Sequence, residues 1–123
     1  MDPISTPLSF EENQLNVLQA WNPSRPHEQA VQQQAIQQWK DLNHWRIAKL
    51  AEAQIWETQV LEDATKWEDI QRFQKINPSD GIQVHRNLVS SCIQSHRTLV
   101  ADSIQAARDQ LYVSTQSCIQ SHL

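Results

Sequence analysis

The chain has 123 residues, a net charge of −4 and a pI of about 5.6. This length allows a single domain, and the acidic balance argues against a dedicated binder of nucleic acid or of anionic membranes, because such surfaces are normally basic. No stretch approaches the roughly 20 apolar residues that cross a bilayer. The first residues, Met1 to Thr6, also lack the basic and apolar regions of a signal peptide. We therefore expect a cytoplasmic protein.

The N-terminal part of the sequence predicts an irregular arm followed by a short helix. Residues 1–8 contain two prolines and form the arm. Ser9 is the expected helix cap, because Glu12 lies three residues later, as a capping box requires. The helix should span residues 10–21, since Pro23 bars a regular helix immediately before it.

Residues 27–74 contain neither proline nor glycine and predict one helix of about 70 Å. Its most regular feature is a row of tryptophans spaced eleven residues apart: Trp45, Trp56 and Trp67. Eleven residues make close to three helical turns, so the indoles return to nearly the same face. A second apolar row, with Ile36, Leu50 and Leu61, lies beside them and widens the apolar band.

Residues 78–121 predict the third helix, which starts at a favourable cap. Asn77 suits the cap position, and Pro78 suits the first helical position. This helix repeats with the same eleven-residue step: Ile-Gln-Val-His-Arg, Ile-Gln-Ser-His-Arg and Ile-Gln-Ala-Ala-Arg start at residues 82, 93 and 104. The two long helices therefore share one period, and we expect them to pack along it.

A register follows if the two long helices fold back on each other about residue 78, because facing residues then have numbers with a constant sum. At a sum of 156, the tryptophans face aliphatic residues and form the predicted intrachain core: Trp67 with Val89, Trp56 with Val100, and Trp45 with Leu111. At a sum of 154, acids face arginines: Glu68 with Arg86, and Glu57 with Arg97.

The predicted fold is all-α, with one domain over residues 9–123. A short helix precedes a long antiparallel helical hairpin that resembles a coiled coil with a hendecad repeat. The alternative is a swapped connection at 75–79, which would place the third helix on another chain.

The second helix carries more apolar surface than one partner helix covers. The short helix reaches roughly 18 Å of the 70 Å, and burying one large apolar side chain is worth about 1.5 to 3 kcal/mol. The residues expected at an oligomer or partner interface are Ile36, Trp39, Leu50 and Leu61. We therefore predict a homo-oligomer, most simply a dimer that forms a four-helix bundle. Docking of a partner protein's helix is the alternative.

The motif Cys-Ile-Gln-Ser-His occurs twice, and each copy could offer a thiol and an imidazole to zinc: Cys92 with His96, and Cys118 with His122. Zinc needs four ligands, and the two pairs lie about 39 Å apart along one helix. Core packing is the preferred interpretation, and we expect neither a metal nor a cofactor. A single glycine leaves few loops for an oriented base and an oxyanion pocket, so we expect no enzyme.

Arg86, Arg97 and Arg108 form a stripe that could track phosphates, but the register gives two of them acidic partners. Amphipathic repeats with tryptophan also occur in helices that lie on lipid surfaces, yet the acids of the second helix would face anionic headgroups. The expected function is therefore that of a non-enzymatic structural or adaptor protein. A subunit of a nucleic-acid-binding or capsid-like assembly is the alternative, and an amphipathic membrane-surface protein ranks third.

Overall fold

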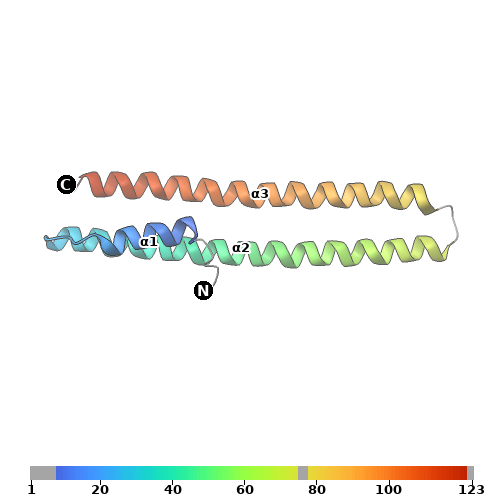
Figure 1. The fold of residues 1–123 in the computed structure, drawn as a ribbon, viewed down its shortest axis with the longest axis horizontal. Coiled ribbons are helices and arrows are strands. Elements are labelled where there is room, and N and C mark those ends of the chain that lie inside the picture. The colour runs from blue at the N-terminus through green and yellow to red at the C-terminus, as the bar shows by residue number, and fades with distance from the viewer. Residues whose placement is uncertain (1–7, 75–77, 122–123) are drawn as a thin grey trace, which may run out of the picture. The chain divides into compact units, whose positions relative to one another are not determined.

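The computed structural model describes residues 8–74 and 78–121, and these contain three helices and no strand. The helices are α1 (Phe10–Ala20), α2 (Pro26–Phe73) and α3 (Pro78–Ser121) (Figure 1). The fold class is all-α, and each predicted helix boundary lies within one residue of the observed one. Most of the predicted arm, the Asn77 cap, residues 75–77 of the connection, and His122 lie outside the described residues.

Both ends of α1 are held by side chains. The backbone N–H of Glu12 donates to Ser9 Oγ at 3.2 Å, and Ser9 Oγ donates back to the Glu12 carboxylate at 3.1 Å, which is the predicted pairing of these two residues. At the other end, Gln32 Nε2 of α2 donates to the carbonyls of Leu18 at 2.8 Å and Trp21 at 2.7 Å. These carbonyls lie at the end of the helix, where no intrahelical donor is left for them. Gln32 thereby ties the end of α1 to α2.

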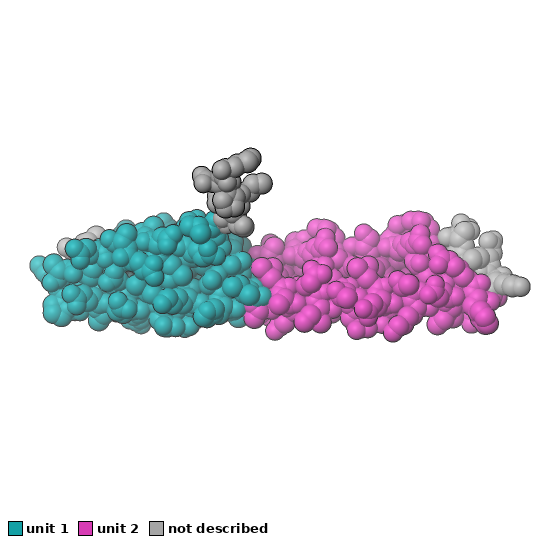
Figure 2. Space-filling view, turned by 60° about the horizontal axis from the view of Figure 1, so that its bottom comes forward, with its two compact units in different colours: residues 1–47, 104–123 teal, residues 48–103 magenta. Residues whose placement is uncertain are grey.

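The chain divides into two compact units (Figure 2). Unit 1 comprises residues 1–47 and 104–123, and unit 2 comprises residues 48–103. Unit 1 therefore contains α1 with one segment of α2 and one of α3, whereas unit 2 contains only the remaining segments of α2 and α3.

The core of unit 1 forms where α1 packs on α2 and α3. Its buried residues are Leu18, Ala35, Ile36 and Trp39, and Leu15, Leu42, Leu111 and Ile119 pack against them. Trp39 has no exposed surface, and its Nε1 donates to Thr115 Oγ1 at 3.1 Å. This hydrogen bond satisfies a buried indole N–H that would otherwise cost free energy.

The prediction that Ile36 and Trp39 belong to an oligomer interface is therefore wrong. Both side chains lie inside unit 1, where α1 covers them. The short helix α1 covers only part of α2, and Ile36 and Trp39 lie in the covered part.

Each eleven-residue step of the repeat in α3 contains one buried residue. Ile82 and Ile93 are buried in unit 2, and Ile104 is buried in unit 1. The next step of the register is Thr115, which is also buried and accepts the hydrogen bond from Trp39. The first isoleucine of each repeat thus points into the helix pair, and the period continues one step past the last visible motif.

Candidate helix-docking grooves

Two ion pairs join α2 to α3 in unit 2. Arg97 donates to both carboxylate oxygens of Glu57, at 2.8 and 3.1 Å, and Arg86 donates to both oxygens of Glu68, at 2.9 and 3.2 Å. These are the pairs that the sum of 154 predicts. A bidentate arginine fixes geometry as well as charge, so the two pairs set the level at which the antiparallel segments meet.

The ion pairs also hold the two acids in their charged form. The hydrogen bond from Arg97 lowers the pKa of Glu57 and outweighs the effect of burial, which raises it. The hydrogen bond from Arg86 does the same for the pKa of Glu68. Each carboxylate therefore stays ionised at neutral pH, and each pair carries no net charge.

The residue before each acid is a tryptophan, and each ring stacks on a histidine of α3. The ring centroids of Trp56 and His96 lie 4.1 Å apart at 27°, and those of Trp67 and His85 lie 4.1 Å apart at 25°. The register named Val100 and Val89 as the facing residues, one helical turn further along α3. A register counts backbone levels, whereas an indole reaches across a turn to a flat imidazole face.

The six residues predicted to form the intrachain core are not buried alike. Five are partly buried: Trp56, Trp67, Val89, Val100 and Leu111. Trp45 is 36% exposed and makes contacts of its own within the described chain. The most deeply buried positions are instead the isoleucines of α3 and the residues beneath α1.

Unit 1 departs from the ion-pair pattern at one position, where α2 has Arg46 instead of the glutamate found at 57 and 68. The facing residue is Arg108, so two arginines meet where the other steps pair an acid with an arginine. Glu11 of α1 supplies the missing acid: its carboxylate accepts a hydrogen bond from Arg108 Nε at 2.5 Å, and Arg46 Nε lies 3.2 Å from its other oxygen.

Glu11 has no exposed surface, so its charge depends on these two arginines. Burial by itself raises the pKa of Glu11. The hydrogen bond from Arg108 and the positive charges of Arg108 and Arg46 outweigh burial, and the pKa lies below its ordinary value. A buried acid of α1 therefore completes the charge balance of α2 and α3 in unit 1.

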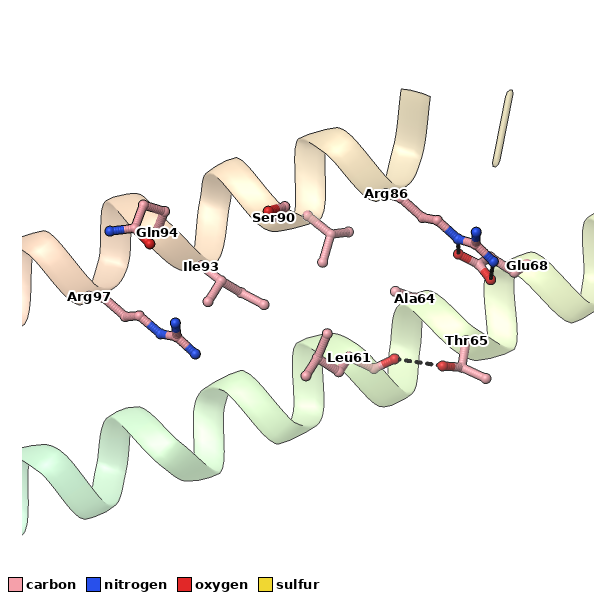
Figure 3. A pocket seen from close by; sticks show the side chains of 10 residues that line it. Leu61, Ala64, Thr65, Glu68, Arg86, Ser90, Ile93, Gln94 and Arg97 are labelled. Carbon is pink, nitrogen blue, oxygen red and sulfur yellow. Dashed lines mark hydrogen bonds and ion pairs between the residues drawn. The ribbon is translucent and has the colours of Figure 1, made fainter. Parts of the chain in front are cut away.

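Two grooves lie beside the ion pairs of unit 2. The larger has a volume of about 500 Å³ and is lined by Leu61, Ala64 and Thr65 of α2 and by Ser90 and Ile93 of α3, among others (Figure 3). The ion pair between Glu68 and Arg86 also lines it, as does Arg97. Figure 3 shows the leucine and isoleucine side chains directed into the space between the two helices.

The second groove repeats the first after a shift of eleven residues. It has a volume of about 350 Å³ and is lined by Leu50, Ala53 and Glu57 of α2 and by Val100 and Ala101 of α3, among others. The corresponding residues of the larger groove are Leu61, Ala64, Glu68, Val89 and Ser90. Each groove thus has a leucine on its α2 side and small residues at corresponding positions on the two helices.

A second shift of eleven residues leads to the set of side chains on which α1 packs in unit 1. The set comprises Trp39, Leu42, Arg46, Arg108, Leu111 and Tyr112. Phe10 of α1 packs against two of its rings, with centroid distances of 5.7 Å to Trp39 and 6.1 Å to Tyr112. The Arg108 guanidinium lies 5.9 Å from the centre of the same phenyl ring. The same register position therefore holds a helix in unit 1 and an open groove in unit 2.

Of the four predicted interface residues, only the two in unit 2 remain at the surface. Leu50 is 46% exposed and Leu61 is 52% exposed, and each lines one of the two grooves. The eleven-residue spacing in the sequence predicted these two leucines. It missed the grooves around them and the buried role of Glu11. The available signal was the change from Trp-Glu at 56 and 67 to Trp-Arg at 45.

The described candidates for metal binding, Cys92, His96 and Cys118, do not form a metal-binding group. Cys92 and Cys118 are free thiols at the surface, and His96 stacks on Trp56. Over the described residues, no group of three or more histidine, cysteine or acidic side chains could hold a metal ion. The arginine stripe is also engaged, because Arg86, Arg97 and Arg108 each bond a carboxylate.

Comparison with known proteins adds no functional information. A scan of protein-family models, a search of curated proteins and a search of solved structures each found no match. None of the helices, over the residues described, is both long and apolar enough to cross a membrane. The grooves of unit 2 and the charges beside them are therefore the features that bear on function.

Proposed function

We propose that the chain is a non-enzymatic structural or adaptor protein that acts through its long amphipathic helices. We favour self-association over the binding of a different partner protein, in a coiled-coil-like assembly within the cytoplasm. The observation that supports the proposal most is the contrast between the units: a helix fills the groove position of unit 1, whereas both groove positions of unit 2 are open.

The exposed leucines give such docking a driving force. Full burial of a leucine is worth about 1.5 to 3 kcal/mol, so covering a side chain that is about half exposed contributes on the order of 1 kcal/mol. Leu50 and Leu61 each offer this gain, and the grooves beside them add contact with small residues of both helices. Single exposed leucines are common on protein surfaces, but leucines that line repeated grooves favour a binding site.

The alternative functions have less support. A subunit of a nucleic-acid-binding or capsid-like assembly would need arginines that are available to phosphates, and the stripe of Arg86, Arg97 and Arg108 is bonded to carboxylates. The free, exposed thiols of Cys92 and Cys118 suit the reducing cytoplasm that we propose. Salt-dependent retention on immobilised nucleic acid would favour the alternative over our proposal.

Light scattering coupled to size exclusion tests the proposal. At micromolar concentration we expect a mass of at least two chains, and the double substitution Leu50→Gln with Leu61→Gln should shift the mass towards one chain. The matched control is Leu88→Gln with Leu99→Gln, because these leucines are also eleven residues apart, are each 64% exposed, and line neither groove. A wild-type monomer, or equal effects of the two double substitutions, would contradict the proposal.

A further inference from the structure

We infer that the two grooves of unit 2 receive unit 2 of a second copy of this chain, and that the residues at 46, 57 and 68 keep α1 out of them. The inference rests on the proposed self-association and names the surface and the partner. It is carried by three features of the described residues: the charges that select α1, the neutrality of the grooves, and the match of large and small side chains.

Charge assigns α1 to unit 1. Its buried Glu11 needs two arginines, which it finds in Arg46 and Arg108. At the corresponding steps of unit 2, Arg97 and Arg86 are already bonded to Glu57 and Glu68. An α1 helix placed there would bring a second carboxylate to an arginine that has one, without an additional positive charge. Like charges in a partly buried site disfavour that arrangement, whether α1 comes from the same chain or from another.

The lining of the unit 2 grooves is otherwise uncharged, which suits a second copy of itself. Beside the closed ion pairs, the larger groove is lined by aliphatic, alanine, serine, threonine and glutamine side chains. Two such surfaces meet without net repulsion and without unpaired charges to desolvate. A partner helix with a strongly acidic or basic face gains no complementary charge here.

The side chains of the surface are also complementary to one another. Leu50 and Leu61 stand on α2 eleven residues apart, and the small residues Ala53 and Ala64 share that spacing. Across the groove, α3 contributes Ser90 and Ala101, again eleven residues apart. In a two-fold dimer the same surface serves as both partners. When the facing helices of the two copies run in opposite directions, one register brings both leucines of each copy, Leu50 and Leu61, against small residues of the other copy.

Cysteine cross-linking tests the inference. Arg97 lines both grooves, so a two-fold axis between the grooves brings the adjacent turn of α3 close to its own copy. In a background with Cys92→Ser and Cys118→Ser, Gln94→Cys places a thiol on the groove side of that turn, because Gln94 lines the larger groove. The matched control is Ser95→Cys, the next residue, which is exposed and lines neither groove.

Under mild oxidation we expect the Gln94→Cys protein to form disulfide-linked dimers at least about tenfold faster than the Ser95→Cys protein, because proximity raises the effective thiol concentration. Far-ultraviolet circular dichroism checks that both variants keep the same helix content. Equal or faster cross-linking at residue 95 would overturn the inference while leaving self-association intact. If the serine background is itself a monomer by light scattering, the proposed function fails, and the inference fails with it.

Discussion

Unit 1 and unit 2 contain the same α2 and α3 repeat but differ in what covers it. In unit 1, α1 packs on the groove position, and its Glu11 satisfies two arginines. In unit 2, each arginine of the repeat has its acid on α2, and the groove position is open. In charge, the two cases differ by arginine at 46 against glutamate at 57 and 68, and in size unit 1 has Trp39, Leu42 and Tyr112 where the grooves of unit 2 have leucine, alanine and alanine or serine. A regular repeat therefore acquires a specific binding position for α1 where both the charge and the side-chain size change at one step.

The largest effect should come from the centre of unit 1. Trp39→Ala removes a fully buried indole and leaves the Thr115 hydroxyl without its partner, so we expect a loss of about 3 to 5 kcal/mol of unfolding free energy. Denaturant titration followed by circular dichroism measures the loss. The comparison is Trp56→Ala in unit 2, which should cost less because that ring is only partly buried. Equal losses would show that α1 adds no burial that the helix pair lacks.

The fold was largely predictable because its main signals are periodic and local. The absence of proline and glycine over 27–74, the cap at Ser9 and the shared eleven-residue step determined the helices, and the charges on the two rows determined the ion pairs. The site was predictable only in part. The period found Leu50 and Leu61, but Ile36 and Trp39, predicted for the same interface, are buried in unit 1.

What the period could not supply was the position of α1, because that helix lies outside the repeat. Its location depends on Glu11 meeting Arg46 and Arg108, residues far apart in the sequence. A period gives the face on which a residue lies, but not which distant segment covers that face. The Trp-His stacks were missed for a related reason, since ring directions depend on side-chain reach as well as on backbone level.

The second prediction concerns the charge that holds α1. Glu11→Gln keeps the shape of the side chain but leaves two partly buried arginines without a counter-charge. We expect a loss of about 1.5 to 3 kcal/mol of unfolding free energy, the range for hydrogen bonds to charged groups. The same denaturant titration measures it, and hydrogen exchange should show reduced protection of the α1 amides. Glu57→Gln is the matched variant in unit 2 and should destabilise less, because Arg97 is 60% exposed and retains water. A larger loss from Glu57→Gln would contradict the distinction between the units.

The third prediction follows from the lowered pKa values of Glu11, Glu57 and Glu68. A carboxyl whose pKa is lower in the folded state stabilises the protein above its unfolded pKa, and this stabilisation is lost as the pH falls through the folded value. The melting temperature should therefore fall as the pH is lowered below the ordinary glutamate value of 4.5. The Glu11→Gln protein should show a shallower fall. An identical pH profile would mean that Glu11 is not ionised in the folded chain.

The smallest predicted effect tests whether the two steps of unit 2 are equivalent. His96→Ala removes the stack on Trp56, and His85→Ala removes the stack on Trp67; the two stacks have the same centroid distance and differ by only 2° in angle (27° and 25°). We expect each substitution to cost about 0.5 to 1.5 kcal/mol by denaturant titration. Alanine is compatible with this register position, because Ala107 occupies it in the third repeat.

A difference of more than about 1 kcal/mol between the two variants exceeds what the spread of such stacks explains. It would show that the grooves of unit 2 are not interchangeable, and the dimer surface would then centre on one groove instead of both.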